Sequence, residues 1–355
     1  MTILFLEFII SLLLMFIGTQ LLVNSSVSIS NHLSIPKLII GLTVVSLATS
    51  LPEFFVTFQS TLKGLNDFAI GNVVGSNISN IALVLGLTAL IKPVVLSKKE
   101  FKLNYIPLLL ISVGFVIILF TSSSLGKFYA VGSIISLIIF NVFLFKKGQG
   151  LVLEDDFDDK NIFTFLKWQI HIKSLLVLFF ILLIGTFIMW ISSEILIESA
   201  KEVAKLFGVS DRVIAISLVA IGTSLPELFT SLYSIYNGET KLALGNLLGS
   251  NVFNILAVLG FTSLISDIEI TTSLKSIIIN GQSLLGTLHG DVIIMLIFTI
   301  LLLPLFYFFN IQRFNIFKNK NTEVQKNMDE MRIVPSEGLI LLLLYTGYLI
   351  VLFIQ

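Results

Sequence analysis

The amino-acid sequence predicts an all-α membrane protein of ten transmembrane helices, arranged as two inverted five-helix repeats. Of its 355 residues, 55% are hydrophobic and only 12% are charged, and the mean hydropathy is +1.00. Ten segments are apolar over the length of about 20 residues that a helix needs to cross the hydrocarbon core. A block of sequence also occurs twice, and the two copies are displaced by an odd number of spans.

The ten predicted spans extend over the whole sequence. They are 3–22, 38–62, 68–91, 103–121, 128–145, 174–193, 213–236, 242–265, 291–310 and 337–354. The first has no basic segment before it and no small-residue cleavage site after it, so we expect a retained helix and not a signal peptide. The stretch Ser273–Leu288 is apolar but interrupted by glycines, short for a span, and without a counterpart in the first half.

The distribution of positive charge predicts the orientation. The loops after the first, third, fifth, seventh and ninth spans hold most of the 22 lysine and arginine residues. Because cytoplasmic loops carry the excess of positive charge, we expect these loops to be cytoplasmic and both termini to face outward. The predicted location is the cell membrane, which the chain crosses many times.

The duplicated block defines the two repeats. Its first copy reads ATSLPE at 48–53 and GNVVGSNISNIALVLG at 71–86, and its second reads GTSLPE at 222–227 and GNLLGSNVFNILAVLG at 245–260. Because the copies are five spans apart, the second must cross the membrane upside down relative to the first. Inverted repeats of this kind form substrate sites at their interface near the bilayer midplane. We expect a first repeat at 1–145, a short cytoplasmic loop at 146–173 and a second repeat at 174–355.

The connecting loop contains the acidic run EDDFDD at 154–159. Hard cations take carboxylate oxygens, so a regulatory calcium site is one interpretation. Blocks of like charge are more commonly solvated and disordered, and we expect a plain connector.

Each copy of the block carries one glutamate inside a predicted span, Glu53 or Glu227. A charge at the bilayer centre costs at least about 3 kcal/mol, so such residues are usually functional. Residues three, four and seven positions earlier share the helix face of each glutamate. These residues are Ser46, Thr49 and Ser50 in the first copy, and Ala220, Thr223 and Ser224 in the second.

A proline precedes each glutamate and removes one main-chain hydrogen bond. Pro52 lacks the N–H that would bond the carbonyl of Ala48, and Pro226 has the same effect on Gly222. A freed carbonyl inside the membrane must be satisfied by another group, and a bound cation is one candidate.

The helix that follows each glutamate adds amide and hydroxyl groups on one face, together with small residues. The polar groups are Asn72, Ser76 and Asn80 in the first copy, and Asn246, Ser250 and Asn254 in the second. The glycines, which favour close helix packing, are Gly71, Gly75, Gly245 and Gly249. A lone serine or threonine in a membrane helix usually bonds its own backbone, but the duplication of the whole set favours a site. Carboxylate, hydroxyl and amide oxygens without sulfur or imidazole suit Ca²⁺, Na⁺ or Mg²⁺ and disfavour zinc and copper.

Composition argues against several other functions. The net charge of zero gives no support for a nucleic-acid partner. The absence of cysteine excludes disulfides, thiolate metal sites and cysteine nucleophiles. The three histidines lie outside the predicted spans and no HExxH motif is present, so an intramembrane enzyme has no support. A channel would not need two inverted cages, although the sequence alone does not forbid one. We expect no cofactor, the lipid bilayer as surroundings, and no protein partner.

The TSLPE and GNxxGSNxxN motifs, in two copies of opposite orientation, resemble the α-repeats of the cation/calcium exchanger superfamily, and within it the sodium/calcium exchangers. The resemblance extends over all ten spans. It implies an antiporter that exchanges Na⁺ for Ca²⁺ by alternating access, with Ca²⁺ and Na⁺ as the transported substrates. The central site that it implies is Glu53, Asn80, Glu227 and Asn254. The flanking sodium positions that it implies are Ser46, Thr49, Ser50, Ser76, Ala220 (through its carbonyl), Thr223, Ser224 and Ser250.

The chain departs from the family pattern at three points. Ala48 stands where the motif usually has glycine, and Asn254 stands where several relatives, including potassium-dependent ones, have aspartate. With only two carboxylates in the site, we expect no potassium dependence. The large cytosolic regulatory domain of animal exchangers is missing, which favours a microbial, unregulated form. A proton/calcium antiporter of the same superfamily is the alternative, although such relatives usually depart from the TSLPE sequence that both halves keep here.

Overall fold

The computed structural model describes residues 2–148, 162–165, 168–206, 222–270, 287–317 and 330–354, and nearly all of these are helical. The first-half helices are α1 (Thr2–Leu33), α2 (Lys37–Ile40), α3 (Ser46–Thr49), α4 (Leu51–Leu62), α5 (Asn66–Ser79), α6 (Leu85–Ile91), α7 (Lys98–Thr121) and α8 (Lys127–Gly148), with π-helical segments η1 (Gly41–Val45) and η2 (Asn80–Val84). The described helices of the second half are α9 (Leu175–Leu206), α11 (Leu225–Tyr236), α12 (Thr240–Phe253), α13 (Leu259–Ile265), α15 (Leu288–Phe317) and α16 (Pro335–Ile354), with the π-helical segment η4 (Asn254–Val258).

These helices confirm the predicted all-α membrane fold. Among the described residues, eight helices are long and apolar enough to span a membrane, and the segments 37–49 and 51–62 together form a ninth that bends by 42°. Nine of the predicted spans therefore coincide with described helices. The remaining one, the seventh span at 213–236, is described only from residue 222 on. The acidic run at 154–159 and the stretch Ser273–Leu288, except its C-terminal end, lie outside the described residues.

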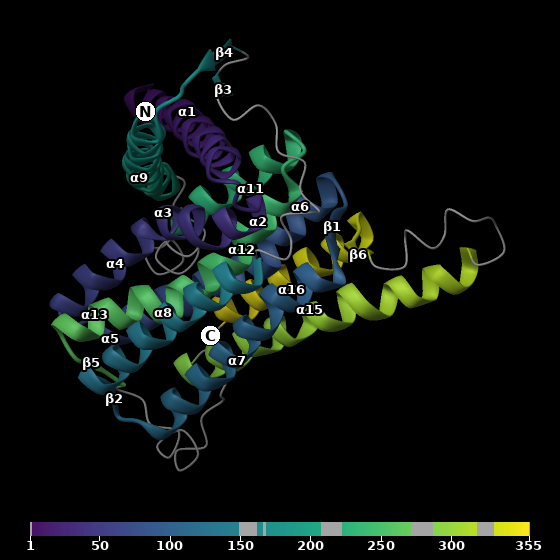
Figure 1. Cartoon of the computed structure of the whole chain (residues 1–355). Helices are drawn as coiled ribbons and strands as arrows, with labels where there is room; N and C mark the ends of the chain where they lie inside the picture. Colours follow the sequence, from purple (N-terminus) through teal and green to yellow (C-terminus); the bar gives the residue numbers. More distant parts are fainter. Residues whose placement is uncertain are drawn as a thin grey trace.

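Short strands support the predicted alternation of the loops. The strand β1 (Val94–Ser97) pairs antiparallel with β6 (Glu330–Ile333), and these strands follow the third and ninth spans. The strand β2 (Ser124–Leu125) pairs with β5 (Ile268–Glu269), and these follow the fourth and eighth spans. Figure 1 shows the two pairs at opposite ends of the helical bundle. Loops that follow odd-numbered spans thus pair with each other, and so do loops that follow even-numbered spans. This is expected if every span crosses the membrane once, because loops of the same parity then lie on the same side.

Two ion pairs also join loops that follow odd-numbered spans. The Nζ atom of Lys37 lies 2.8 Å from Oε1 of Glu239, and Nζ of Lys241 lies 2.9 Å from Oε1 of Glu100. Glu100 belongs to a capping box, in which it accepts a hydrogen bond from the backbone N–H of Ser97 at the start of α7. The end of α12 that carries Glu239 and Lys241 is therefore tied to two places in the first half of the chain.

The last helix of each half packs against the other half. Helix α16 packs along α6, and α8 packs along α13 and η4. Gly86 and Gly338 face each other across the first of these contacts, where a Cβ on Gly338 would lie 2.6 Å from the carbonyl oxygen of Gly86. Close backbone approach of this kind replaces the hydrophobic driving force that lipid surroundings do not provide between helices.

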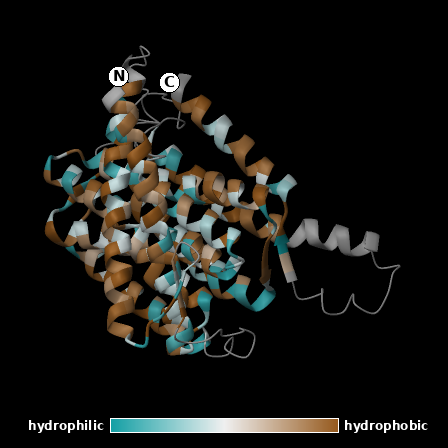
Figure 2. Ribbon diagram, turned by 90° about the horizontal axis from the view of Figure 1, so that it is seen from above, coloured by the Kyte–Doolittle hydropathy of each residue, from teal (hydrophilic) through white to brown (hydrophobic). Residues whose placement is uncertain are grey.

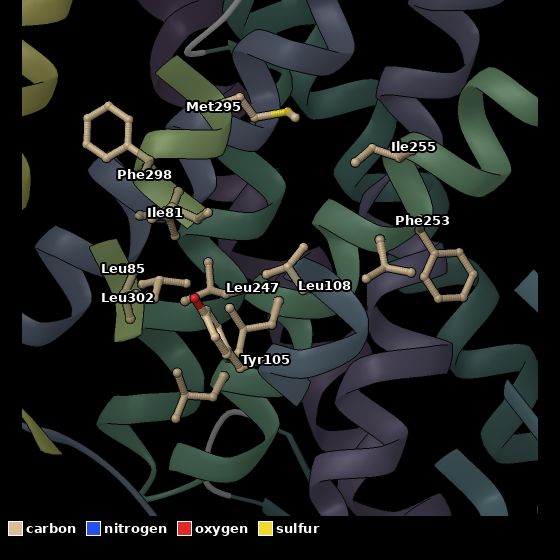
Figure 3. Packing of buried hydrophobic residues seen from close by; sticks show 14 of the residues in the cluster. Ile81, Leu85, Tyr105, Leu108, Leu247, Phe253, Ile255, Met295, Phe298 and Leu302 are labelled. Carbon is tan, nitrogen blue, oxygen red and sulfur yellow. The ribbon is translucent and has the colours of Figure 1, made fainter. Parts of the chain in front are cut away.

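A large cluster of buried apolar residues unites the two halves. Figure 3 shows side chains from η2, α6 and α7 interleaving with others from α12, η4 and α15. Within the cluster, the rings of Phe101 and Phe306 lie 4.8 Å apart. Hydrophobic residues predominate along the helices in Figure 2, and many of those on α8 and α9 are exposed, as a lipid-facing surface requires.

Helices α1 and α9 form a separate pair beside this bundle, as Figure 1 shows. They approach closely at Gly18, where a Cβ would lie 2.9 Å from the carbonyl oxygen of Gly185. A hairpin of β3 (Ile162–Phe165) and β4 (Trp168–His171) packs against α1. The amide of Asn24 on α1 donates to the carbonyl of Thr164 at 2.6 Å and to the hydroxyl of Tyr233 on α11 at 3.1 Å.

Candidate functional site

Both helices that carry the buried glutamates break one turn before the carboxylate. The break between α3 and α4 lies at Ser50, whose φ and ψ are −83° and 5°. At Ser224, which precedes α11, these angles are −84° and 2°. Pro52 and Pro226 occupy the first turn of the new helix, where a missing N–H costs nothing. The proline in each copy of the block therefore starts a half-helix whose first turn carries the glutamate.

Glu53 and Glu227 are fully buried and belong to the two repeats. Their carboxylates lie close enough for their charges to interact. Ser76 lies beside the Glu53 carboxylate, and Thr49 and Ser250 lie beside that of Glu227. Among the described residues, none donates a hydrogen bond of ordinary geometry to any of the four carboxylate oxygens. Buried carboxylates are costly unless they are paired, and the neutral hydroxyls beside these oxygens do not balance their charge.

Two hydroxyl pairs join the repeats on either side of the glutamates. The Oγ1 atom of Thr49 lies 3.2 Å from Oγ of Ser250, and Oγ of Ser76 lies 3.2 Å from Oγ1 of Thr223. The second pair is the symmetry equivalent of the first under the internal repeat. Thr49 also donates to Oδ1 of Asn246 at 3.0 Å. The structure therefore brings these four hydroxyls together in two pairs across the interface of the repeats.

The other hydroxyls of the predicted set differ in their surroundings. The Oγ of Ser46 lies 2.7 Å from the carbonyl oxygen of Gly41 and 3.0 Å from that of Asn246. The buried Oγ of Ser50 has no hydrogen-bond partner among the described residues. Ser224 is buried at the break before α11. Ala220 lies outside the described residues, so its carbonyl keeps only its sequence-based prediction.

One freed carbonyl has a protein partner. The carbonyl of Gly222, which Pro226 leaves without its helical donor, accepts a hydrogen bond of 3.1 Å from Oγ of Ser193 on α9. A cation is therefore not needed to satisfy this oxygen. Ser193 could not be identified from the sequence, because the contact depends on how α9 packs against the break.

The buried asparagines Asn80 and Asn254 begin the π-helical segments η2 and η4. Segment η4 packs against α4, which carries Glu53, and η2 packs against α11, which carries Glu227. The side-chain oxygens of both asparagines are buried and accept no hydrogen bond from the described residues. Wide helical turns of this type recur at functional sites. The segment that each asparagine begins thus packs against the half-helix that carries the glutamate of the opposite repeat.

Two further asparagines, which helical spacing does not place with the predicted site residues, link this pair. Asn80 donates from Nδ2 to Oδ1 of Asn251 at 3.0 Å, and Asn254 donates to Oδ1 of Asn77 at 3.1 Å. The recurrence of Asn77 and Asn251 in the GSN triplet of both copies was the signal that could have identified them.

The site therefore presents oxygen atoms almost exclusively. No cluster of three or more His, Cys, Asp or Glu residues that could hold a metal ion occurs in the described part of the chain, and the two glutamates are surrounded by neutral hydroxyl and amide oxygens. Such a set of oxygens suits a hard cation and does not suit a soft metal. Because only two of the groups are charged, the cation can also be released again.

Inverted repeats with carboxylates at their interface define a class of protein, the secondary transporters that move a cation through a midplane site. A family model described as "Sodium/calcium exchanger protein" matches residues 3–146 and 177–354. The chain belongs to this family of cation/Ca²⁺ antiporters, and it is a multi-pass membrane transporter and not an enzyme.

Individual relatives agree with this assignment. The putative antiporter CaxA of Alkalimonas amylolytica is 35% identical over 261 residues, which are 72% of this chain and 79% of the relative. The inner membrane protein YrbG of Escherichia coli is 34% identical over 262 residues, 74% of this chain and 80% of the relative. A structure of the archaeal sodium-calcium exchanger NCX_Mj, soaked with Na⁺ and Ca²⁺, matches with a TM-score of 0.71 and 26% identity over 97% of this chain and 96% of that one.

Proposed function

We propose that this protein exchanges Na⁺ for Ca²⁺ across the cell membrane by alternating access, and that Ca²⁺ binds between Glu53 and Glu227. The observation that supports this most strongly is a set of six buried side-chain oxygens, none of which accepts a hydrogen bond of ordinary geometry from the described residues. They are the four carboxylate oxygens of Glu53 and Glu227 and the Oδ1 atoms of Asn80 and Asn254. Six is within the number of oxygen ligands that Ca²⁺ takes.

Charge balance also supports Ca²⁺ as one substrate. Two ionised glutamates equal the charge of one Ca²⁺, so the occupied site is neutral in surroundings that screen charge poorly. Asn80 and Asn254 add oxygens without adding charge. A third carboxylate would leave an excess anion, and the described site contains none.

The hydroxyl pairs support Na⁺ as the second substrate. Na⁺ has about the radius of Ca²⁺, so a cage sized for one accepts the other, and selection depends on charge and on the number of neutral oxygens. The Thr49–Ser250 and Ser76–Thr223 pairs supply neutral oxygens in two symmetric places beside the carboxylates. A site coupled to protons would need the glutamates alone. NCX_Mj, whose fold this chain shares, is a sodium-calcium exchanger.

Transport by purified protein in liposomes tests the coupling ion. Liposomes loaded with Na⁺ and diluted into sodium-free medium should take up Ca²⁺. Equal Na⁺ on both sides should abolish this uptake, and a protonophore should leave it intact. Uptake that ignores the Na⁺ gradient and is abolished by the protonophore would contradict the proposal and identify a proton/calcium antiporter.

A further inference from the structure

Four buried asparagines form a closed hydrogen-bonded set between the repeats, which we call the amide quartet: Asn77, Asn80, Asn251 and Asn254. Asn77 donates from Nδ2 to the backbone carbonyl of Asn251 at 3.2 Å, and Asn251 donates from Nδ2 to the backbone carbonyl of Asn77 at 3.2 Å. The Nδ2 of Asn77 also lies 3.7 Å from Sδ of Met295. The two outer bonds, from Asn80 to Asn251 and from Asn254 to Asn77, complete the set.

The two backbone carbonyls determine which way every amide in the quartet points. A carbonyl oxygen only accepts hydrogen bonds, so the group that faces it must be the NH₂ of Asn77 or Asn251. The Oδ1 atom of each of these residues must then face Asn254 or Asn80. Because Oδ1 also only accepts, Asn254 and Asn80 must turn their NH₂ groups toward it. Their own Oδ1 atoms are left pointing the other way, buried and without a donor among the described residues.

We propose that Asn77 and Asn251 are positioning residues for the cation site, each fixing the amide of the opposite repeat so that an oxygen and not an NH₂ group faces the ion. This inference rests on the proposed function, because it takes Asn80 and Asn254 as cation ligands. An asparagine side chain is nearly symmetric in shape, and a half-turn about its last bond would replace the ligand oxygen with a repelling NH₂ group. The quartet blocks that half-turn, since it would bring two NH₂ groups or two oxygens face to face.

The arrangement crosses between the repeats. Asn77 orients Asn254, whose segment η4 packs against the helix of Glu53, and Asn251 orients Asn80 in the mirror position beside the helix of Glu227. Each repeat therefore supplies the group that orients a ligand in the other. This gives the GSN triplet of both copies a role that the hydroxyl and carboxylate ligands do not explain.

Equilibrium binding of radioactive ⁴⁵Ca²⁺ to the purified full chain in sodium-free detergent solution tests the proposal without assuming a coupling ion. Asn77→Ala should weaken Ca²⁺ binding about fivefold, as expected for one lost neutral hydrogen bond that holds a ligand. Asn254→Asp should remove this dependence, because a carboxylate presents an oxygen whichever way it turns. We therefore expect Asn77→Ala to cause no loss when it is added to Asn254→Asp. The matched control is Asn104→Ala, which removes a buried amide on α7 whose hydrogen bond among the described residues is local, to the carbonyl of Glu100.

Comparing the effect of Asn77→Ala on Ca²⁺ binding in the wild type and in Asn254→Asp distinguishes a positioning role from simple structural support. Equal losses from Asn77→Ala in the wild-type and Asn254→Asp backgrounds, or no loss in either, would overturn the proposal. The mirror pair, Asn251→Ala with Asn80→Asp, provides an independent decision if Asn77→Ala does not yield folded protein. Failure of the proposed function gives a different result: the wild type would bind no Ca²⁺, or Asn254→Ala and Glu53→Gln would bind it as the wild type does.

Discussion

At the scale of single residues, the two buried glutamates carry the charge of the site. Removing one leaves a single negative charge to balance a dication in surroundings of low dielectric constant. We expect Glu53→Gln and Glu227→Gln each to reduce Ca²⁺ transport to background, measured as ⁴⁵Ca²⁺ uptake into liposomes. Glu198→Gln is the matched control, because Glu198 is largely exposed on α9 and its ion pair among the described residues is with nearby Lys201 at 3.5 Å. Uptake near the wild-type rate in either site variant would refute their role.

Asn254 determines how many charges the site holds. Asn254→Asp adds a third carboxylate near Glu53 and Glu227, and the excess negative charge favours an additional monovalent cation, either H⁺ or K⁺. We expect the variant to bind Ca²⁺ still, while its transport becomes more sensitive to acid or is stimulated by K⁺. The measurement is uptake at several pH values and K⁺ concentrations, with Asn104→Asp as a control. An unchanged profile would show that residue 254 does not lie beside the two glutamates.

The residues of the site differ in how far the sequence could predict them. Glu53 and Glu227 were evident, because a charge inside an apolar run is costly and these charges occur at equivalent places in both copies. Thr49, Ser76, Thr223 and Ser250 followed from helical spacing. Asn77, Asn251 and Ser193 could not be selected in this way, because each makes a hydrogen bond to another helix. Spacing along one helix contains no information on which helix packs beside it.

At the scale of helices, the close contact of α12 with α2 and η1 depends on glycine. A Cβ at Gly245 would lie 2.8 Å from the backbone nitrogen of Leu42, and one at Gly41 would lie 3.1 Å from that of Asn246. These neighbours are backbone atoms that cannot move aside independently. The second copy of the block thus confirms the glycine packing predicted from the sequence. For Gly71, in contrast, no described atom lies within 4 Å of an added Cβ.

We expect Gly245→Ala to lower the thermal stability of the purified protein, since overpacking of this kind typically costs about 1–3 kcal/mol. The matched control is Gly132→Ala on the exposed face of α8, where an added Cβ meets no described atom within 4 Å. It should leave the melting temperature unchanged or raise it, because alanine favours a helix over glycine. A thermal shift assay in detergent compares the two. Equal melting temperatures would contradict the close contact.

The helices themselves were predictable, but their partners were not. Hydropathy located the spans because the bilayer imposes their length. The packing of α16 on α6 and of α8 on α13 could not be read from the sequence, because lipid-exposed and helix-facing positions are equally apolar in these segments. The strand pairs β1–β6 and β2–β5 were also missed. Each strand is at most four residues long and lies in a loop.

At the scale of the whole molecule, the inverted repeat requires a defined topology, and the chain is suited to testing it because it contains no cysteine. Lys63 and Lys92 are exposed in the loops after the second and third spans. We expect a cysteine in place of Lys63 to react with a membrane-impermeant maleimide added to intact cells. A cysteine in place of Lys92 should react only after the membrane is permeabilised. Labelling of both from one side would contradict the alternation, and the reverse pattern would invert the orientation.

The central claim is that one glutamate from each inverted repeat contributes to a single cation site. The most direct measurement is an experimental structure of the protein with Ca²⁺ bound. We predict one ion between the half-helices α4 and α11, with carboxylate oxygens of both Glu53 and Glu227 at about 2.4 Å from it. Carboxylates more than about 10 Å apart, or an ion bound elsewhere in the molecule, would contradict the claim, because ligands of one ion lie at bonding distance from it.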